Sequence, residues 1–385
     1  MARKVRMGMV GGGRGAFIGA VHRTAARLDD RVELVCAALS ADPERARASA
    51  QDINLPDDRA YASYQEMFER EATLPVSERM EFVAIVTPNH VHHPVARAAL
   101  EHGFHVLSDK PATLTLAEAR DLAVLIGHTG LLYALTHNYT GYPMIKHARD
   151  LLASGELGKV RKVVAEYSQG WLATPLERSD HKQAAWRTDP ARAGAGGCLG
   201  DIGSHAHNLA EYVTALDVAE VAADLTAFVE GRPLDDDVNI LLRFNNGAKG
   251  VLHASQIAVG AENDLSLRVY TERGGLEWRQ TDANTLLVHR LDQPTQTLRT
   301  AHAYLSDAAR AAARIPPGHP EGYLEAFANI YTAFAADVLA RADDIPAPAT
   351  HDYPGIDDAI RGMAFIEAAV ASSNNNAAWT PVVTA

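Results

Sequence analysis

The sequence predicts a two-domain protein, in which an α/β domain with a doubly wound parallel sheet is followed by an α+β domain with an open, mostly antiparallel sheet. The chain has 385 residues, more than one hydrophobic core usually organises. Its first third alternates short apolar runs with segments of helical periodicity, and beyond about residue 137 strand-like runs follow one another directly. We therefore expect domains at 1–137 and 138–385, with C-terminal helices that can pack back on the first domain.

Apolar runs predict the strands of the first domain, at 5–10, 32–39, 82–86, 105–107 and 131–136. The spacing of Phe17, Val21 and Leu28 predicts an amphipathic helix after the first strand. Asp42-Pro43-Glu44 indicates a second helix start, with proline at the first position. Helical patterns also occupy 94–101 and 116–126. Strands that alternate with helices favour a parallel sheet covered on both faces.

The second domain is expected to begin with a helix at 143–152 and a strand at 160–168, followed by a polar loop from 174 to 200. Further strand-like runs lie at 221–228, 238–244, 248–256, 265–271 and 276–279. Asn245-Asn246-Gly247 and Arg273-Gly274-Gly275 are turn signals between them, which favours antiparallel pairing. Helical periodicity returns at 323–342 and 356–373.

The charge and the cysteine content of the chain indicate its expected partners and compartment. The formal net charge of −12 repels nucleic acid and anionic membranes, so we expect neither as a partner. Cys36 and Cys198 lie far apart and form no CxxC pair, which fits a reducing compartment. The sequence shows no signal-peptide pattern and no apolar run of about 18 residues. We expect a cytoplasmic protein.

A glycine-rich loop follows the first strand and precedes the first helix. Gly11, Gly13 and Ala16 fit the pattern G-x-G-x-x-[G/A] of a Rossmann dinucleotide-binding domain. Gly11 permits the tight turn, Gly13 lets the backbone approach a pyrophosphate, and Ala16 allows close packing of helix and strand. The helix N-terminus supplies N–H donors to the phosphates. The loop therefore predicts NAD(P) as cofactor.

The choice between NAD and NADP stays open. The second strand ends at Ser40, where an NAD site usually carries an acid that binds the ribose hydroxyls. Ser40 and Arg45 suit a 2′-phosphate, whereas Asp42 opposes one.

Three polar stretches carry the candidate chemistry. Thr87-Pro88-Asn89-His90-Val91-His92 and Asp109-Lys110-Pro111 each follow a predicted parallel strand. Ligands of open α/β sheets bind at the carboxyl ends of the strands, so both stretches are expected beside the cofactor. The third stretch, from Gly197 to His205, contains Asp201 and lies in the second domain.

In their order and spacing these motifs resemble the Gfo/Idh/MocA family, which is named for glucose-fructose oxidoreductase, inositol dehydrogenase and a rhizopine-catabolism protein. The resemblance covers nearly the whole chain. It implies a Rossmann domain followed by an α+β domain whose open sheet mediates homodimers or homotetramers. Lys110 matches the family's catalytic lysine, and Asp201 and His205 match its active-site pair. Asp109 is a departure, because the family usually has glutamate before the Lys-Pro pair.

The chemistry of these residues agrees with the resemblance. Positions four apart on a helix share a face, so Asp201 and His205 can point in one direction. Oxidation of a secondary alcohol needs a base for the hydroxyl proton, and histidine titrates near neutral pH. Lys110 would stabilise developing alkoxide charge. Each residue also has a non-catalytic explanation. Lys110 could be a surface lysine, His205 a structural histidine and Asp201 a helix N-cap.

The expected cofactor-binding residues are Gly11, Gly13, Arg14, Gly15, Ala16, Ser40, Arg45, Thr87, Pro88, Asn89, His92, Asp109, Lys110 and Pro111. The expected substrate-binding residues are Asn138, Tyr139, Trp171, Lys182, Gln183, Trp186, Arg187, His205 and His207, because a sugar needs polar partners for its hydroxyls and aromatic cover for its ring faces. Lys182 and Arg187 either recognise an anionic sugar or belong to an ordinary solvated loop. His90, His92 and His93 lack a coherent ligand face, so no metal is expected.

Three functions remain open. The first is a sugar or polyol dehydrogenase with net turnover of NAD(P). The second is a glycosidase that uses bound NAD for transient oxidation and elimination. The third is a non-catalytic sugar sensor, which the joint presence of Lys110, Asp201 and His205 argues against.

Overall fold

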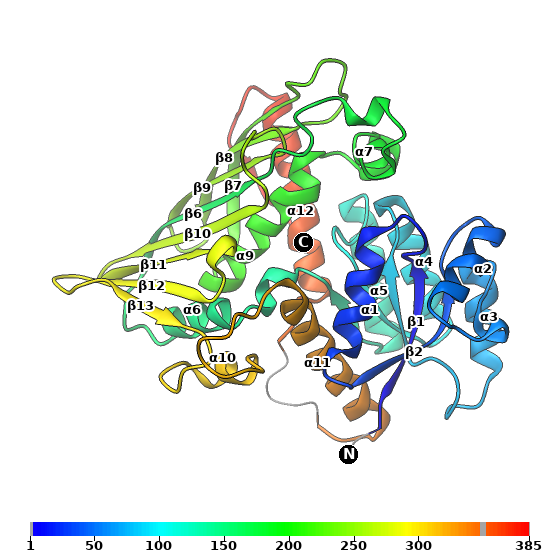
Figure 1. Cartoon of the computed structure of the whole chain (residues 1–385). Helices are drawn as coiled ribbons and strands as arrows, with labels where there is room; N and C mark the ends of the chain where they lie inside the picture. The colour runs from blue at the N-terminus through cyan, green and yellow to red at the C-terminus, as the bar shows by residue number, and fades with distance from the viewer. Residues whose placement is uncertain (1–2, 347–351, 385) are drawn as a thin grey trace. The chain divides into compact units, whose positions relative to one another are not determined.

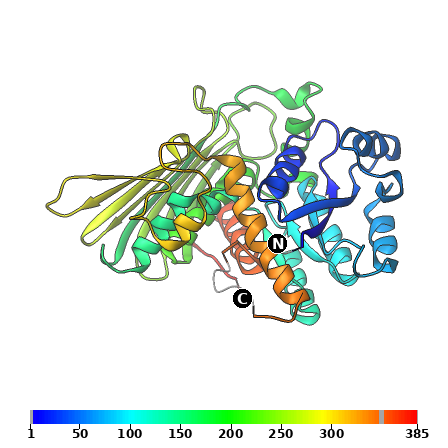
Figure 2. The same cartoon turned by 60° about the horizontal axis from the view of Figure 1, so that its bottom comes forward.

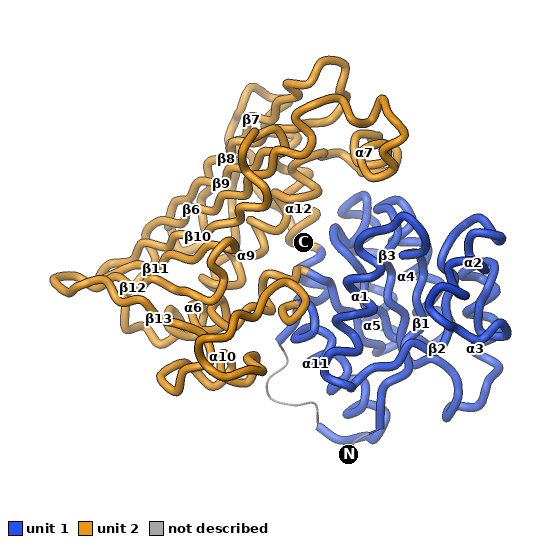
Figure 3. The backbone as a smooth tube through the Cα atoms, viewed as in Figure 1, with its two compact units in different colours: residues 1–136, 327–359 blue, residues 137–326, 360–385 orange. Residues whose placement is uncertain are grey.

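The computed structural model describes residues 3–346 and 352–384. The chain forms two compact units, one made of residues 1–136 and 327–359 and the other of residues 137–326 and 360–385 (Figure 3). Within the residues that the structure describes, no helix is both long and apolar enough to span a membrane.

The first unit is built on a five-stranded parallel sheet with the order β2-β1-β3-β4-β5 (Figure 1). This confirms the predicted Rossmann-type domain. The strands are β1 (Val5–Gly11), β2 (Val32–Ala38), β3 (Phe82–Val86), β4 (His105–Ser108) and β5 (Tyr133–Leu135).

The helices of this unit are α1 (Phe17–Leu28), α2 (Pro43–Asp52), α3 (Tyr64–Thr73), α4 (His92–Glu101) and α5 (Leu116–Thr129), with η1 (Asp57–Arg59) and η2 (Asn89–Val91) as short 3₁₀ turns. Asp42 caps α2 by accepting the Arg45 N–H at 2.8 Å, and Pro43 takes the first helical position, as predicted. Helix α3 was not predicted, because its charged sequence carries only a short apolar stripe.

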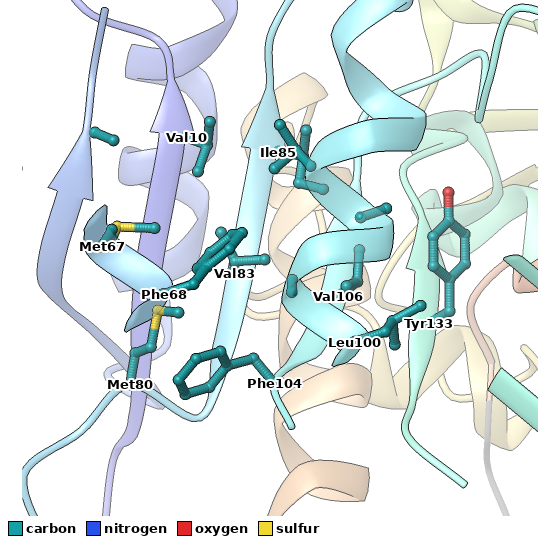
Figure 4. Packing of buried hydrophobic residues seen from close by; sticks show 14 of the residues in the cluster. Val10, Met67, Phe68, Met80, Val83, Ile85, Leu100, Phe104, Val106 and Tyr133 are labelled. Atoms are coloured by element: carbon teal, nitrogen blue, oxygen red, sulfur yellow. The ribbon is translucent and has the colours of Figure 1, made fainter. Parts of the chain in front are cut away.

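The core of the first unit lies between its sheet and helices α3 and α4. Phe68 and Met67 of α3 pack with Val83 of β3 and Phe104, all without measurable exposure or nearly so (Figure 4). Every residue of β3 is buried, as expected for the central strand of a parallel sheet covered on both faces. The packing holds the carboxyl ends of β1, β3 and β4, where the polar motifs begin.

The second unit contains a nine-stranded sheet with the order β13-β12-β11-β10-β6-β9-β8-β7-β14. Its neighbouring strands are antiparallel except for the parallel pair β6 and β9, so the predicted mostly antiparallel sheet is confirmed. The strands are β6 (Val160–Ser168), β7 (Val218–Thr226), β8 (Asp237–Phe244), β9 (Lys249–Ser255), β10 (Asp264–Thr271), β11 (Gly274–Arg279), β12 (Thr285–Arg290), β13 (Gln296–Arg299) and β14 (Thr380–Pro381).

Helices α6 (Pro143–Ala153) and α9 (Ser204–Thr214) pack along one face of this sheet (Figures 1 and 2). Further elements are η3 (Asn138–Gly141), η4 (Leu176–Arg178), η5 (Leu199–Gly203), η6 (Gln280–Asp282), α10 (Asp307–Ala311), α11 (Tyr323–Ala342) and α12 (Ile356–Asn374). The last two confirm the helices predicted near the end of the chain.

The stretch 174–200 is not the continuous loop that we expected. It contains the short helices α7 (Lys182–Arg187) and α8 (Pro190–Ala193). The His181 ring accepts the Ala184 N–H at 3.2 Å and so caps α7. Histidine is not among the usual capping residues, so sequence patterns did not indicate this helix start.

His22 of α1 is fully buried within the first unit. Its Nδ1 lies 2.8 Å from the hydroxyl oxygen of Tyr331, and its ring packs edge-on against Phe327 and Tyr331. Burial lowers the pKa of His22 to about 4 from an ordinary value of 6.5.

The lowered pKa of His22 predicts that the first unit becomes less stable as the pH falls. As the pH falls from 6.5 towards 4, the unfolded chain takes up a proton that folded His22 refuses, so the free energy of unfolding decreases by about 3 kcal/mol. We expect His22→Gln to lower this pH dependence in urea unfolding measured across that range. His128→Gln, the same change at an exposed position of α5, is the matched control. If the free energy of unfolding of His22→Gln depended on pH as steeply as that of the parent, the prediction would be wrong.

Candidate active site

The glycine loop joins β1 to α1 in the first unit. Gly11 and Gly12 have φ values of +83° and +74°, which L side chains rarely adopt. A Cβ at Gly12 would lie 2.8 Å from the Cα of Gly19, so α1 meets the end of β1 through these two glycines. Ala16 precedes α1 without a side-chain cap, which leaves the first-turn N–H groups suited to an anion.

Gly13, to which we assigned the close approach of the pyrophosphate, and Gly15 lie in different surroundings. The Gly13 N–H donates to Leu39 O at 3.2 Å, and a Cβ at Gly13 would lie 2.6 Å from that oxygen and 2.7 Å from Ser49 Oγ. Gly13 is therefore packed against the end of β2 and α2. A Cβ at Gly15 would meet nothing within 4 Å, so the open side of the loop is at Gly15. Gly12 and Gly19 allow close packing of helix and strand, a role that we had assigned to Ala16 alone.

The Thr-Pro-Asn motif follows β3 beside this loop. A Cβ at Gly11 would lie 2.8 Å from Thr87 Cγ2, which places Thr87 against the glycine turn. Thr87 Oγ1 is buried and has no hydrogen-bond partner among the described residues. A buried hydroxyl usually has a partner, so this orphaned group fits a bound dinucleotide next to the loop.

His92 joins the motifs that follow β3 and β4. Its Nε2 lies 2.8 Å from Thr87 O, and its Nδ1 lies 2.7 Å from Pro111 O. Burial lowers the pKa of His92, although Asp109 opposes the shift. Asp109 accepts the Lys110 N–H at 2.9 Å and the Thr136 hydroxyl at 3.0 Å. The aspartate side chain, although shorter than the glutamate usual in the family, therefore still binds the residues that follow β4 and β5.

Of the two residues expected to distinguish NADP from NAD, Ser40 forms a hydrogen bond within the protein and Arg45 is exposed. Ser40 Oγ accepts the Asp42 N–H at 3.1 Å, and the Arg45 side chain is exposed. Arg14 forms a bidentate pair with Asp52 at 2.6 and 2.7 Å. Arg14 therefore contributes its backbone rather than a free cation to the loop.

Asp201 and His205 lie at the start of α9 in the second unit. Asp201 belongs to η5, a π-helical turn, and His205 follows it in the first turn of α9. Asp201 Oδ2 accepts hydrogen bonds from Arg187 Nε at 3.0 Å and from Gln256 Nε2 at 2.8 Å. π-Turns within helices frequently mark functional sites.

Aromatic rings surround His205. The rings of His137 and Tyr139 stand edge-on to it at centroid distances of 5.3 and 4.9 Å, and Tyr167 lies 6.2 Å away. The Nδ1 atoms of His205 and His137 are 3.4 Å apart. This enclosure restrains the His205 ring and couples its tautomer to that of His137.

The tyrosines near His205 belong to a polar network. The Tyr139 and Tyr167 hydroxyls are 2.5 Å apart, and Tyr167 donates to Asn263 Oδ1 at 2.8 Å. Gln169 Nε2 also donates to Asn263, at 2.6 Å, and Gln169 Oε1 accepts the Trp171 indole N–H at 2.9 Å. Burial raises the pKa values of both tyrosines, so they stay protonated hydrogen-bond donors at neutral pH.

Arg187 connects Asp201 to the predicted substrate residues of α7. Its Nη1 donates to Gln183 Oε1 at 2.7 Å, and its guanidinium stacks 4.2 Å from the Trp186 ring centroid. The Trp171 ring lies 5.9 Å away on another segment. Lys182 is exposed. The structure thus brings together Asp201, Gln183, Trp186 and Arg187, and Trp171 joins them.

Two predicted substrate residues lie in other surroundings. His207 stacks on Phe365 of α12 at 4.1 Å, and its Nε2 lies 3.3 Å from a Glu211 oxygen, so its ring is used in helix packing. Asn138 is buried in η3, and its Nδ2 has no hydrogen-bond partner among the described residues. It remains a candidate donor for a ligand.

Sequence reasoning missed Tyr167, Gln169, Gln256 and Asn263. Tyr167 and Gln256 fall within predicted strands, where a buried polar residue is an uncommon and therefore informative signal. Asn263 and Gln169 carry no motif, and only their pairing across the sheet identifies them.

The histidines after β3 bind protein groups. His93 Nε2 lies 2.8 Å from Asp121 Oδ2, and both His92 nitrogens face carbonyl oxygens. Among residues 3–346 and 352–384, no group of three or more His, Cys, Asp or Glu side chains is arranged to hold a metal ion.

Comparison with known proteins identifies the family. A profile described as "Oxidoreductase family, NAD-binding Rossmann fold" matches residues 5–137, and the profile of the GFO/IDH/MocA C-terminal domain matches residues 145–277. The chain belongs to the Gfo/Idh/MocA family. It is therefore an oxidoreductase with an NAD-binding Rossmann domain.

Relatives of the family cover almost the whole chain. An uncharacterised oxidoreductase of Bacillus subtilis, YfiI, is 32% identical over 98% of this chain and 97% of its own length. The crystal structure of an oxidoreductase from Sinorhizobium meliloti is 47% identical, with a TM-score of 0.88 over 98% of this chain and 99% of that one. An inositol dehydrogenase homologue from Azotobacter vinelandii, complexed with NAD⁺, is 34% identical, with a TM-score of 0.95 over 99% of this chain and 98% of that one. An inositol dehydrogenase homologue from the same organism, complexed with NADH and myo-inositol, is 33% identical, with a TM-score of 0.93 over 99% of this chain and 98% of that one.

The tyrosine network predicts a stability effect. Tyr167→Phe removes the hydroxyl that contacts Tyr139 and Asn263, so we expect the free energy of unfolding to fall by about 1–3 kcal/mol in chemical denaturation. Tyr270→Phe, at an exposed position of β10, should change it by less than about 0.5 kcal/mol. Equal effects of the two substitutions would show that the network contributes nothing.

Proposed function

We propose that this protein is a sugar or polyol dehydrogenase that transfers hydride between a secondary hydroxyl and a bound nicotinamide cofactor. The observation that carries the proposal is the placement of Asp201 and His205 on one π-to-α helix start, with His205 enclosed by aromatic rings. A relative 33% identical over nearly the full chain has been solved with NADH and myo-inositol, which supports this substrate class.

His205 is the proposed base. Its Nδ1 lies 3.4 Å from Nδ1 of His137, so the tautomers of the two rings decide which nitrogen donates at that contact. We assign to His205 the removal of the hydroxyl proton, a role worth about 10²–10⁴-fold in rate. The bound cofactor supplies the hydride acceptor. Lys110 of the first unit, by its match to the family motif, is assigned to stabilise the developing alkoxide.

The side chains around Asp201 suit a polyhydroxylated ligand. Asp201, Gln256 and Arg187 offer both hydrogen-bond donors and acceptors, and the indoles of Trp171 and Trp186 offer apolar faces. Asp201 compensates the charge of Arg187 at 3.0 Å, so the pair is electrically balanced. Because Asp201 already neutralises the Arg187 cation, the site favours a neutral polyol over a negatively charged sugar acid.

Assembly into homodimers or homotetramers through the nine-stranded sheet is part of the proposal. Leu241 of β8 and Tyr270 of β10 are exposed large apolar side chains on this sheet, and burial in an interface would remove them from water. Light scattering coupled to size-exclusion chromatography measures the assembly directly.

Substitution of the proposed catalytic residues tests the function. Lys110→Ala and His205→Ala should each lower kcat about 10²–10⁴-fold with NAD⁺ or NADP⁺ and myo-inositol or the related sugars of a polyol panel. NADH binding, followed by fluorescence, should survive, because the glycine loop and all the other expected cofactor-binding residues remain when Lys110 is replaced. Lys159→Ala and His319→Ala are matched controls at exposed positions.

Each result of this assay has a defined meaning. Substrate-dependent NADH formation that is lost in the two variants supports the dehydrogenase. Parental rates in both variants would refute the site. Release of an aglycone from glycosides without net NADH formation would identify the glycosidase, and binding without any turnover would identify the sensor.

Cofactor choice gives a separate prediction. We propose that Ser40 and Arg45 let the site accept a 2′-phosphate, so Arg45→Ala should weaken NADPH binding about tenfold by removing a charge-assisted hydrogen bond. NADH binding should be unchanged. Fluorescence titration of both cofactors measures this, and a parental preference for NADH would overturn the role given to Ser40 and Arg45.

A further inference from the structure

Asp235, in the loop between β7 and β8, binds the backbone that leads into the proposed active-site turn. Its Oδ1 accepts the Gly197 N–H and its Oδ2 accepts the Leu199 N–H, both at 2.7 Å. The main-chain oxygen of Asp235 accepts the Cys198 N–H at 2.9 Å. A single residue thus binds three consecutive N–H groups.

The bound segment leads directly to Asp201 and His205. The Asp201 N–H donates to Gly197 O at 2.9 Å, and the π-helical turn Leu199–Gly203 begins at a residue that Asp235 binds. A Cβ at Gly197 would lie 2.4 Å from Asp235 O, so only glycine permits this close approach. The position of the turn is therefore fixed from the β7–β8 loop.

Asp235 differs from the neighbouring Asp236. Asp236 accepts N–H bonds from Phe228 and Val229 and also pairs with Arg232 at 3.0 Å. The Asp235 carboxylate binds only main-chain N–H groups, and no cation compensates it within the described part of the chain. Burial raises the pKa of Asp235 to about 6, with these N–H bonds opposing the shift. Keeping this carboxylate ionised opposes folding, a cost typical of functional sites.

We propose that Asp235 is a positioning residue, which holds the π-helical turn so that Asp201 accepts from Arg187 and Gln256 while His205 faces His137. The inference rests on the proposed dehydrogenase function. Without the Asp235 anchor the turn is free to relax towards ordinary α-helical geometry, which would rotate Asp201 away from its two donors. Asp235 itself is assigned no contact with substrate or cofactor.

Asp235→Asn tests the inference because the amide keeps one acceptor and turns an NH₂ group towards the other N–H. Hydrogen–deuterium exchange should show the amides of 197–203 exchanging at least about tenfold faster than in the parent. kcat should fall about tenfold or more with NAD⁺ and the polyol oxidised most rapidly in the panel that includes myo-inositol, while the NADH dissociation constant stays the same. Asp237→Asn is the matched control, because that carboxylate accepts from the side chain of Asn239 at 2.9 Å and binds no part of the turn.

A double-mutant cycle separates positioning from general destabilisation. If Asp235 acts through Asp201, adding Asp235→Asn to Asp201→Asn should lower the rate by less than about twofold further. Asp235→Glu, which retains the charge on a longer arm, is the second variant if the asparagine form does not fold, and it should show faster exchange and a lower kcat.

The outcomes distinguish the two proposals. Unchanged exchange at 197–203, a parental kcat in Asp235→Asn, or a fully additive loss with Asp201→Asn would overturn the positioning role. If Asp201→Asn and His205→Ala themselves keep the parental rate, the proposed function is wrong, whereas faster exchange in Asp235→Asn would still report the anchoring of the turn.

Discussion

The carboxylate of Asp201 is the point on which the proposed active site depends. One oxygen accepts from Arg187 on α7 and from Gln256 at the end of β9, so three segments far apart in the sequence meet at a single atom. A partly buried carboxylate is stable only with such partners, and each donor would lose its acceptor if Asp201 moved. The stacking of Arg187 on Trp186 follows from this fixed guanidinium.

Both units hold their polar motifs through hydrogen bonds to the backbone. In the first unit His92 contacts the carbonyl oxygens of Thr87 and Pro111, which ties together the loops after β3 and β4. In the second unit Asp235 binds N–H groups ahead of Asp201. Loops at the ends of strands lack regular hydrogen-bond ladders, so buried side chains of this kind supply the missing partners.

Local signals in the sequence were sufficient for much of the fold. The Asp42-Pro43 helix start, the strands of the parallel sheet and the glycine loop all depend on neighbouring residues, and the structure contains them where they were predicted. Strands β12 and β13 were not predicted. β13 is short and polar, which hides it from pattern reasoning, whereas the apolar run of β12 was overlooked. Helix α7 was missed because its cap is His181.

The sequence predicted the motif residues of the candidate site, but it did not predict which side chains they contact. Asp201 and His205 were identified by their resemblance to the family motif, and the π-helical turn at Leu199–Gly203 differs from the ordinary helical geometry that we used to place them on one face. Tyr167 meets Asn263, and Asp201 meets Gln256, only because the sheet brings distant residues together. The close packing of Gly13 likewise depends on where Leu39 and Ser49 lie, which the sequence does not show.

The most direct test of the central claim is the transfer of a hydrogen label from substrate carbon to cofactor. The protein would be incubated with NAD⁺ and a polyol deuterated at its carbon atoms, and the reduced cofactor analysed by mass spectrometry. The account predicts NADH that carries deuterium, formed more slowly than from the unlabelled polyol and much more slowly again in Asp201→Asn. Unlabelled NADH, or labelling at the parental rate in Asp201→Asn, would contradict it.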